Sequence, residues 1–471
     1  MDGKLGRRIA SGRLGGCERL HRIMISRNPR TPTMTFKEGL LHARHHIVFL
    51  LGLIGAFGLV IGLETWNIEQ EIRESMIIED TAGLPVPQPA ELTEQEKQWA
   101  EISWRYFENN YQPTTGLVNS VDKYPAATMW DTASYLLALI AAQGLELIQP
   151  EKFDKHMAAA LAALSQLPLF DSQLPNKSYN TVSLEMVNYQ NEKSERGIGW
   201  SAIDIGRLMV PFNILTWNFP QHTAAVRAVL KRWDFSPMIR DGVMYGAAVD
   251  EDGDTIYVQE GRIGYEEYGA KALALAGLDV SRALNYQDFL RFIKVYGVKV
   301  PTDDRNPEKY HAHNYVVSEN YILDGLEYGW DDTSKEFAYR VYKAQEERFE
   351  HRGILTAVSE DNLDVNPYFV YNTVFTDGKT WNTITEAGDD ASAFKTLSTK
   401  AAFGWDALYR TDYTAKLMEK ASTLFDAERG FYSGLYERTQ EPNRAITANS
   451  NAIILESLYF RRFGPFLRIG K

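Results

Sequence analysis

The segment GYEEYGAKALALAGL, residues 264–278, starts with aromatic and acidic residues and continues as a run of small and apolar ones. The run has almost no polar face, so we expect a helix that other elements surround on all sides. Tyr and Glu at its start are side chains that can contact a ligand at a helix end. This combination decides the fold because it recurs along the chain.

Five other segments share a small or polar start with aromatic residues, followed by an Ala-, Leu- or Gly-rich helix, at intervals of roughly 50–80 residues. They are MWDTASYLLALIAAQGL (129–145), GWSAIDIGRLMVPFN (199–213), SENYILDGLEYG (318–329), STKAAFGWDALYR (398–410) and TANSNAIILESLYF (447–460). More polar, amphipathic stretches such as 152–165 and 221–233 separate them. The sequence therefore predicts an all-α fold, an (α/α)6 toroid of six inner and six outer helices. Short β-hairpins are expected in its loops, one of them over residues 241–261.

Residues 47–63, IVFLLGLIGAFGLVIGL, contain no charge and approach the length of a bilayer span. Lys and Arg dominate the sequence before this stretch and Glu follows it, so the positive-inside rule puts the N-terminus in the cytoplasm. We expect a single-pass signal anchor in a bacterial inner membrane, with the main domain in the periplasm. A cleaved signal peptide and a buried core helix are the alternatives. Translation could start at Met1, Met24 or Met34.

These features divide the chain into four parts. They are a basic cytoplasmic leader (1–46), a transmembrane anchor (47–63), an acidic and then Pro-rich stalk (64–93) and the toroidal domain (94–471).

The composition excludes several classes of protein. The net charge is −12 over 471 residues, and because residues 1–46 carry a surplus of +7, the remainder carries −19. Such a body argues against nucleic acid and against polyanionic ligands such as uronate polymers. The one cysteine, Cys17, lies in the leader, so the rest of the chain can hold no disulfide, thiolate nucleophile or Cys-ligated zinc.

Carboxyl groups gather at the starts of the predicted inner helices, at Asp131, Asp204, Glu266 and Glu267. Hydrolysis of a glycosidic bond needs one protonated carboxyl group and a second carboxylate, and aromatic faces hold sugar rings. The candidate substrate-binding residues are Trp130, Trp200, Tyr265, Tyr268, Arg262, Trp405, Asn449 and Asn451. This is the composition of a glycan-processing site.

Each acid also has a purely structural interpretation. Asp131 could be a helix cap, Asp204 could close a capping box with Ser201, and Glu266 and Glu267 could serve the helix dipole. Adjacent helical residues do not share a face, so only one of Glu266 and Glu267 should reach the cleft. We expect Asp131 and Glu267 to face each other as the reacting pair, with Glu266 as the substitute for Glu267. Asp204 would keep one of them protonated by like-charge repulsion.

Two weaker patterns are typical of metal sites. Asp250, Asp252 and Asp254 resemble part of a calcium loop, but Thr255 stands where its glycine is expected, which favours a solvated hairpin tip. His311 and His313, followed by Glu319, are better explained as a surface loop. No metal and no cofactor is expected.

The motifs GIGWSAIDIGRLM (197–209), QEGRIGYEEYGAKAL (259–273) and ITANSNAIILESL (446–458), with WDTASYLLAL before them, resemble the domain-of-unknown-function family numbered 3131. The resemblance covers roughly residues 94–465 and implies a bacterial envelope protein. That family is distantly similar to glucoamylase-like (α/α)6 enzymes, including the β-1,2-glucanases of glycoside hydrolase family 144. By this likeness Asp131 and Glu267, or Glu266, would be the positions to carry over as acids.

Three functions remain open. The first is a membrane-anchored glycoside hydrolase acting on a neutral β-glucan. The second is a polysaccharide lyase, and the third is a non-catalytic glycan-binding or assembly subunit beside a polysaccharide synthase. Free carboxylates in a shared cleft favour an enzyme, whereas acids used as helix caps favour a binding protein.

Overall fold

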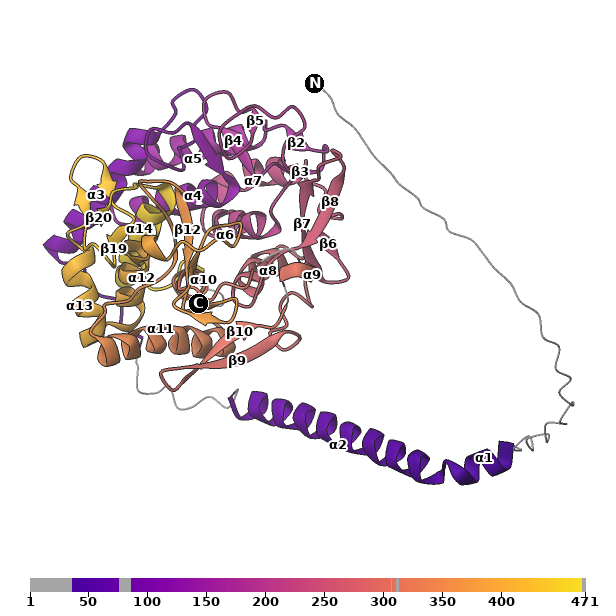
Figure 1. Ribbon diagram of the computed structural model, residues 1–471. Coiled ribbons are helices and arrows are strands. Elements are labelled where there is room, and N and C mark those ends of the chain that lie inside the picture. Colours follow the sequence, from indigo (N-terminus) through magenta and orange to yellow (C-terminus); the bar gives the residue numbers. More distant parts are fainter. Residues whose placement is uncertain (1–35, 76–85, 306, 311–312, 468–471) are drawn as a thin grey trace, which may run out of the picture. The chain divides into compact units, whose positions relative to one another are not determined.

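The computed structural model describes residues 36–75, 86–305, 307–310 and 313–467 (Figure 1). The chain divides into two compact units, Met1–Glu69 and Gln70–Lys471. The first unit contains α1 (Phe36–His42) and most of α2 (Arg44–Ser75). Within α2, Arg44–Gly62 is a 19-residue stretch with a mean hydropathy of 2.0, none of it buried against protein. By length and composition this stretch could cross a membrane, and it coincides with the predicted anchor.

Six helices form a closed ring in the second unit. Each packs on the next one along the chain, and the last packs on the first. They are α4 (Met129–Gly144), α6 (Ala202–Asn218), α8 (Tyr265–Leu275), α10 (Glu319–Leu323) with its π-helical continuation η3 (Asp324–Tyr328), α12 (Thr399–Tyr409) and α14 (Ala448–Phe463). All six predicted inner segments are therefore helical, and the (α/α)6 prediction is confirmed.

The outer layer differs from the prediction at one position. The outer helices are α3 (Glu94–Asn110), α5 (Pro150–Leu164), α7 (Thr223–Leu230), α11 (Asp332–Arg352) and α13 (Asp412–Ala421). Between α8 and α10 the described chain instead forms a hairpin of β9 (Leu290–Val295) and β10 (Val298–Asp303), which packs on α11. Tyr296 and Gly297 both have positive φ, 50° and 87°, so their turn joins two antiparallel strands and no helix continues.

The remaining strands form small antiparallel sheets in the loops. The predicted hairpin is present as β7 (Val243–Val249) and β8 (Thr255–Gln259), in which Val249 pairs with Thr255 across the acidic tip. The others are β1 (Ala126–Thr128), β2 (Leu169–Phe170), β3 (Leu174–Pro175), β4 (Ser178–Asn180), β5 (Met186–Val187), β6 (Ile239–Arg240), β11 (Glu360–Asn362), β12 (Phe369–Asn372), β13 (Phe375–Thr376), β14 (Lys379–Thr380), β15 (Thr383–Ile384), β16 (Thr396–Ser398), β17 (Phe425–Asp426), β18 (Gly430–Phe431), β19 (Gly434–Tyr436) and β20 (Pro442–Asn443). Three short helical turns complete the described chain: α9 (Pro307–Tyr310), η2 (Pro220–His222) and η4 (Ser392–Phe394).

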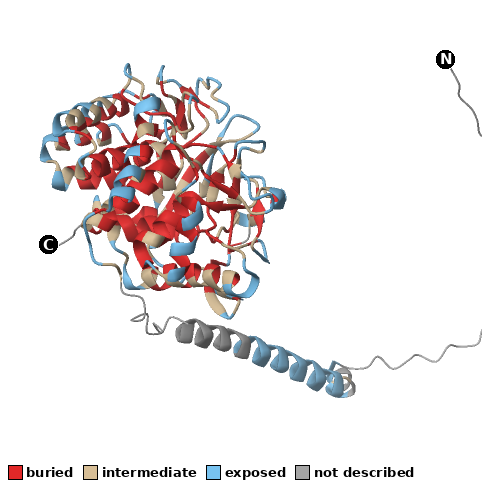
Figure 2. Cartoon of the chain, turned by 90° about the vertical axis from the view of Figure 1, so that its left-hand side faces the viewer, coloured by how far each residue is buried: buried red, intermediate tan, exposed pale blue. Residues whose placement is uncertain are grey.

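Small residues allow the inner helices to approach closely, and most inner-helix residues are buried (Figure 2). A Cβ atom on Gly206 of α6 would lie 2.8 Å from Cα of Gly269 of α8, so no larger residue fits there at this helix separation. The all-round Ala, Leu and Gly composition seen in the sequence is therefore the packing surface of the ring.

A charged network occupies the interior of the ring. The guanidinium of Arg207 on α6 donates to Glu327 at 2.8 Å, to the Tyr268 hydroxyl at 2.7 Å, and to Glu456 and Ser134 at 3.3 Å each. The Tyr268 hydroxyl also donates to Glu327, at 2.6 Å. Five inner elements, α4, α6, α8, η3 and α14, thus share one set of contacts.

The charges of this network balance if one of its two acids carries a proton. The side chains of Arg207, Glu327 and Glu456 are fully buried. Burial raises the pKa of Glu456 well above its ordinary value, and the adjacent Glu327 charge raises it further. A neutral Glu456 beside the Arg207–Glu327 ion pair leaves no net charge in the core.

We predict that Arg207→Leu lowers the free energy of unfolding by about 3–5 kcal/mol, because it leaves the Glu327 carboxylate buried without a counterion. Urea unfolding of the full chain in detergent, followed by tryptophan fluorescence, measures this loss. Lys152→Ala is the control, because Lys152 and its partner Glu108 are 42% and 46% exposed. Equal stabilities of the two variants would contradict a central role for Arg207.

Candidate functional site

The indole of Trp130 helps to join the N-terminal ends of four inner helices. Its Nε1 donates to Glu319 Oε1 at 3.1 Å and to Asn449 Oδ1 at 3.3 Å. The Asn449 amide donates to the same Glu319 oxygen at 2.7 Å, and Lys400 forms an ion pair with the other oxygen. These residues are each the first or second of their helices, so α4, α10, α12 and α14 begin at one common end of the ring.

Partly exposed aromatic rings lie at this end. Tyr265, the first residue of α8, meets Trp130 edge to face with 5.8 Å between ring centroids, and its hydroxyl donates to Glu360. Tyr315 and Tyr371 stack with 3.7 Å between centroids and 7° between planes. Burial, the Tyr315 hydroxyl and the charge of Glu360 raise the pKa of Tyr371, so this pair lies beside the same carboxylate.

Three of the predicted acids share one position, the third residue of an inner helix. In Asp131, Asp204 and Glu267 alike, the carboxylate accepts a hydrogen bond from the residue at the helix cap. The donors are Thr128 Oγ1 at 2.8 Å, Ser201 Oγ at 3.0 Å and the Gly264 N–H at 2.6 Å. The capping interpretation that the sequence left open therefore describes all three, because each closes the first turn of its helix.

Asp204 combines this cap with the pKa that proton donation requires. The residue as a whole has intermediate exposure. Burial raises the pKa of Asp204 to about 7, and the nearby charges of Glu260 and then Asp131 act in the same direction against the Ser201 hydrogen bond. With this raised pKa, Asp204 can still carry a proton near neutral pH.

Asp131 and Glu267, the pair expected to react together, have different neighbours. Burial raises the pKa of Asp131, while hydrogen bonds from Ser120 and Thr128 and the charge of Lys400 oppose the shift. Burial raises the pKa of Glu267 to about 8, and the charge of Glu266 adds to the shift. The structure thus groups Asp131 with Asp204, and Glu267 with Glu266.

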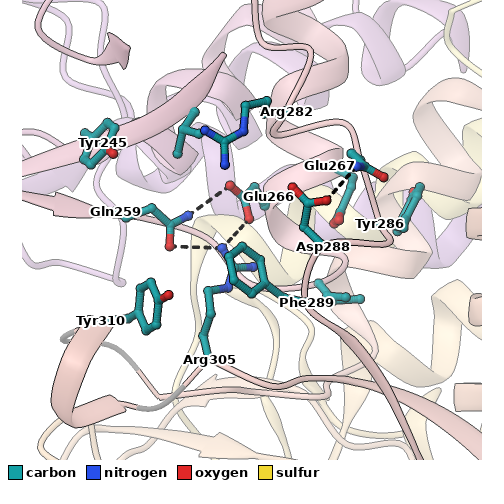
Figure 3. A pocket seen from close by; sticks show the side chains of 13 residues that line it. Tyr245, Gln259, Glu266, Glu267, Arg282, Tyr286, Asp288, Phe289, Arg305 and Tyr310 are labelled. Carbon is teal, nitrogen blue, oxygen red and sulfur yellow. Dashed lines mark hydrogen bonds and ion pairs between the residues drawn. The ribbon is translucent and has the colours of Figure 1, made fainter. Parts of the chain in front are cut away.

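Glu266 and Glu267 line a cavity of about 210 Å³ (Figure 3). Glu266 forms an ion pair with Arg305 at 2.7 Å and accepts from the Gln259 amide at 2.9 Å. Tyr265 and Tyr268 instead contact Trp130 at the end of the ring. Both glutamates therefore lie on a different side of α8 from these two tyrosines.

Two carboxyl groups near Asp204 and Tyr265 escaped the sequence reasoning. Glu260, directly after β8, accepts from the N–H groups of Ala202 and Ile203 and so caps α6. Glu360 begins β11 and accepts from Tyr265 and, at 3.1 Å, from Ser359. Both residues lie in loop or strand segments that lack the repeated helix pattern. No periodicity in the sequence therefore indicated them. We call Trp130, Asp204, Glu260, Tyr265 and Glu360 the rim site.

Several predicted sugar-binding side chains are buried, which contradicts a role in stacking on or contacting a ligand. Trp200 and Trp405 are fully buried, and their indoles donate to Tyr245 O at 3.0 Å and Ser318 Oγ at 3.1 Å. Tyr268 belongs to the Arg207 network, and Asn451 is fully buried with its Oδ1 accepting from Phe431 N at 2.8 Å. Their aromatic or amide character serves the core, which the sequence could not distinguish from a binding surface.

Arg262 and Asn449 lie close to the candidate site, although both are largely buried. Arg262 donates to the carbonyl of Gly261 and, at 3.4 Å, to that of Tyr310. Asn449 is held by Trp130 and Glu319, so it orients the Trp130 ring. A direct contact of either residue with sugar stays a prediction.

Neither weaker metal pattern has a ligand arrangement in the described residues, which contain no group of three or more His, Cys, Asp or Glu side chains placed to hold an ion. Asp250 caps its own turn, accepting from the N–H groups of Asp252 and Asp254 at 3.1 and 2.8 Å. His313 contacts Asp377 at 2.8 Å, whereas Glu319 lies in the ring with Lys400. His311 falls outside the described residues.

Solved structures with low sequence identity share this fold. The endo-β-1,2-glucanase of Chitinophaga pinensis, solved with sophorotriose and glucose, superposes with a TM-score of 0.56 at 12% identity over 79% of this chain and 94% of that chain. The endo-β-1,2-glucanase of Talaromyces funiculosus, solved with sophorose, gives 0.55 at 11% identity over 79% and 84%. The glucoamylase of Hormoconis resinae gives 0.50 at 11% identity over 78% and 73%. No curated protein sequence matches the chain.

Residues 98–464 match the family described as "Protein of unknown function (DUF3131)", which is most of the chain and includes all six inner helices. The match also covers the acids at the inner-helix starts and both carboxyl groups that the sequence reasoning missed. The chain therefore belongs to the DUF3131 family.

Proposed function

We propose that the ring domain is a glycoside hydrolase that acts on a neutral β-glucan. The observation that carries the proposal is the rim site. Asp204, beside Asp131 at the start of α4, and Glu360, which accepts from Tyr265, lie at the same end of the ring as the partly exposed rings of Trp130 and Tyr265. An acid, a second carboxylate and aromatic faces are what cleavage of a glycosidic bond requires.

In this proposal Asp204 is the proton donor. With a pKa of about 7 it holds a proton near neutral pH and can give it to the departing glycosidic oxygen. Asp131 and Glu260 contribute negative charge that helps to keep this proton on Asp204.

Glu360 is the second carboxylate. Burial raises its pKa, but the charge of Lys400 opposes this shift, and the Tyr265 hydroxyl donates to it. In its charged form Glu360 takes a proton from water as the water oxygen attacks the anomeric carbon. The bond from that carbon to the leaving oxygen then breaks, and the leaving sugar carries the proton from Asp204.

The reacting pair proposed here differs from the pair expected from the sequence. Asp131 and Glu267 each accept a capping hydrogen bond, and their nearest charged neighbours differ. We assign Asp131 an electrostatic and capping role, and Glu267 a place in the cavity beside α8.

A neutral glucan is the proposed substrate for two reasons. Residues 47–471 carry a net charge of −19, since the whole chain carries −12 and the leader +7, and this charge repels a polyanion. In addition, solved relatives in fold are described as β-1,2-glucanases, one of them bound to sophorose. The same charge argues against a lyase acting on uronate polymers.

One observation favours a second candidate function, a non-catalytic glycan-binding or assembly subunit beside a polysaccharide synthase. All three acids at the third position of inner helices form capping hydrogen bonds. If Asp204 does nothing more than this, the aromatic rings of the rim site would bind a glycan without cleaving it.

We predict that Asp204→Asn and Glu360→Gln each lower the release of new reducing ends by at least about 100-fold, the lower range for a lost acid or base. The assay uses the full chain in detergent with β-1,2-, β-1,3- and β-1,4-glucans and with polygalacturonate. Asp234→Asn is the control, since it removes the charge of an exposed acid that accepts from the Ser236 N–H at 2.9 Å and belongs to neither the rim site nor the cavity beside α8. We expect it to retain most activity.

Glucan binding with no cleavage by the unmodified protein would support the binding subunit instead. Cleavage of polygalacturonate in preference to the glucans would support the lyase. Full activity of Asp204→Asn would remove the proposed proton donor, and equal losses in Asp204→Asn and the Asp234→Asn control would show that the assay does not report on the rim site.

The raised pKa of Asp204 also predicts how stability depends on pH. The folded protein holds this proton up to about pH 7, whereas an unfolded chain loses it near pH 4. The folded state binds more protons than the unfolded state in this window. The contribution of Asp204 to the free energy of unfolding is therefore greatest below about pH 4 and declines as the pH rises to about 7. Asp204→Asn should flatten the decline in urea midpoints measured between pH 4 and 8. An unchanged slope would contradict the raised pKa.

For the location of the domain, we propose a bacterial inner membrane with residues 64–471 in the periplasm. The basis is the basic leader before the apolar stretch Arg44–Gly62. Alkaline phosphatase fused after Lys471 is expected to be active, because it needs the oxidising periplasm. Green fluorescence from a reporter that folds only in the cytoplasm, at the same junction, would reverse the orientation.

A further inference from the structure

The cavity of about 210 Å³ beside α8 is formed largely by the stretch of chain that makes no outer helix (Figure 3). Between α8 and α10 this stretch provides Arg282, Phe289, Arg305 and Tyr310 to the cavity wall. Tyr245 and Gln259 of the β7–β8 hairpin and the two glutamates at the start of α8 complete it. The departure from six outer helices thus coincides with a space that has its own lining.

The walls of this cavity are aromatic with polar groups between them. Phe289 and Tyr310 meet edge to face with centroids 5.9 Å apart, and the Arg305 guanidinium lies 4.4 Å from the Phe289 ring centroid. Within the described residues, the hydroxyls of Tyr245 and Tyr310 form no hydrogen bond, so they can serve a ligand. Aromatic faces with a few fixed polar groups are typical of small-molecule sites.

Two of the charged side chains that line the cavity form an ion pair with each other. Arg305 is 1% exposed and forms ion pairs with Asp303 and, at 2.7 Å, with Glu266. Gln259 connects the two, donating to Glu266 at 2.9 Å and accepting from Arg305 at 3.0 Å. The lining carries charges of both signs, with Arg282 and Arg305 beside Glu266, Glu267 and Asp288, and such fixed donors and acceptors suit the hydroxyls of an uncharged ligand.

We propose that this cavity binds one residue of a neutral saccharide, as a second sugar site separate from the rim site. A cavity of about 150 Å³ accommodates a bare six-membered ring, so the larger volume here fits a ring with hydroxyl groups. The inference takes its ligand class from the proposed function, but it does not depend on cleavage. The site would hold a glycan end while another part of the chain lies at the rim.

The two sites can be altered independently, because they use different faces of α8. Tyr265 contacts Trp130 and Glu360 at the rim, whereas Glu266 and Glu267 line the cavity. The residues suited to mutation are Arg282 and Tyr310, which line the cavity from its solvent side and belong to neither the Arg207 network nor the rim site.

The test is calorimetric titration of the full chain, in a detergent without a sugar head group, with sophorotriose, laminaritriose and cellotriose. Glu360→Gln is present in every sample to prevent turnover. We expect two binding events for at least one trisaccharide, and Arg282→Ala with Tyr310→Ala should weaken one event at least tenfold. Arg291→Ala is the matched control, because this arginine in β9 has a side chain that is 64% exposed and does not line the cavity.

Circular dichroism establishes that the double variant is folded, and Tyr310→Phe separates loss of the ring from loss of the hydroxyl. In the background with Glu360 intact, the double variant should still cleave glucan. A folded double variant that binds all three trisaccharides as tightly as the control overturns the second site and leaves the proposed function standing. Binding that depends on Arg282 and Tyr310, in a protein that cleaves nothing, would support the cavity and contradict the hydrolase.

Discussion

The Arg207 guanidinium is the interaction on which the ring depends. It is fully buried and contacts side chains from four other inner elements, so each inner helix in the set is oriented by the same group. Burial of an arginine is unfavourable unless its charge is neutralised and its N–H groups are hydrogen-bonded. The carboxyl and hydroxyl groups of the neighbouring helices provide both. Small residues bring the backbones near enough for this, as the Gly206–Gly269 contact illustrates. Close packing of the inner helices brings the partners of Arg207 within hydrogen-bond distance, and the Arg207 contacts in turn hold these helices together.

The candidate site follows from the same geometry. When inner helices begin at a common end, their first turns bring cap residues, carboxylates and aromatic rings into one region. The acids at the third helix position, Asp131, Asp204 and Glu267, all accept capping hydrogen bonds. Their presence at this position is explained by helix capping alone. What separates Asp204 from Asp131 is its surroundings, because Glu260 adds negative charge beside Asp204 whereas Lys400 lies near Asp131. The charges of loop and neighbouring residues, more than the helix position itself, distinguish the acid that we propose as proton donor from the acid that we propose as a cap.

In the described chain, one position of the outer layer, between α8 and α10, holds a hairpin in place of an outer helix, and the cavity beside α8 lies there. The hairpin with the Tyr296–Gly297 turn packs on α11, and the chain on either side of it lines the cavity beside α8. The ring domain thus offers two places with aromatic and polar walls, one at the helix ends and one beside α8. Two contacts along one glycan chain would raise affinity through effective concentration without demanding tight binding at either.

The sequence by itself predicted the ring, because six Ala-, Leu- and Gly-rich helices, separated by more polar amphipathic ones, bury their faces against one another when they close into a double-layered ring. It also determined the apolar stretch before the ring and the β7–β8 hairpin, whose strands alternate around an acidic turn. Tertiary structure alone decided which side chains meet. Trp200 and Trp405 lie in the core, although their sequence context matches that of Trp130 and Tyr265 at the rim. Glu260 and Glu360 join the site from loops that carry no periodic signal. Periodicity reports which face of a helix is buried, but the partner of a carboxylate is set by chain segments distant in sequence.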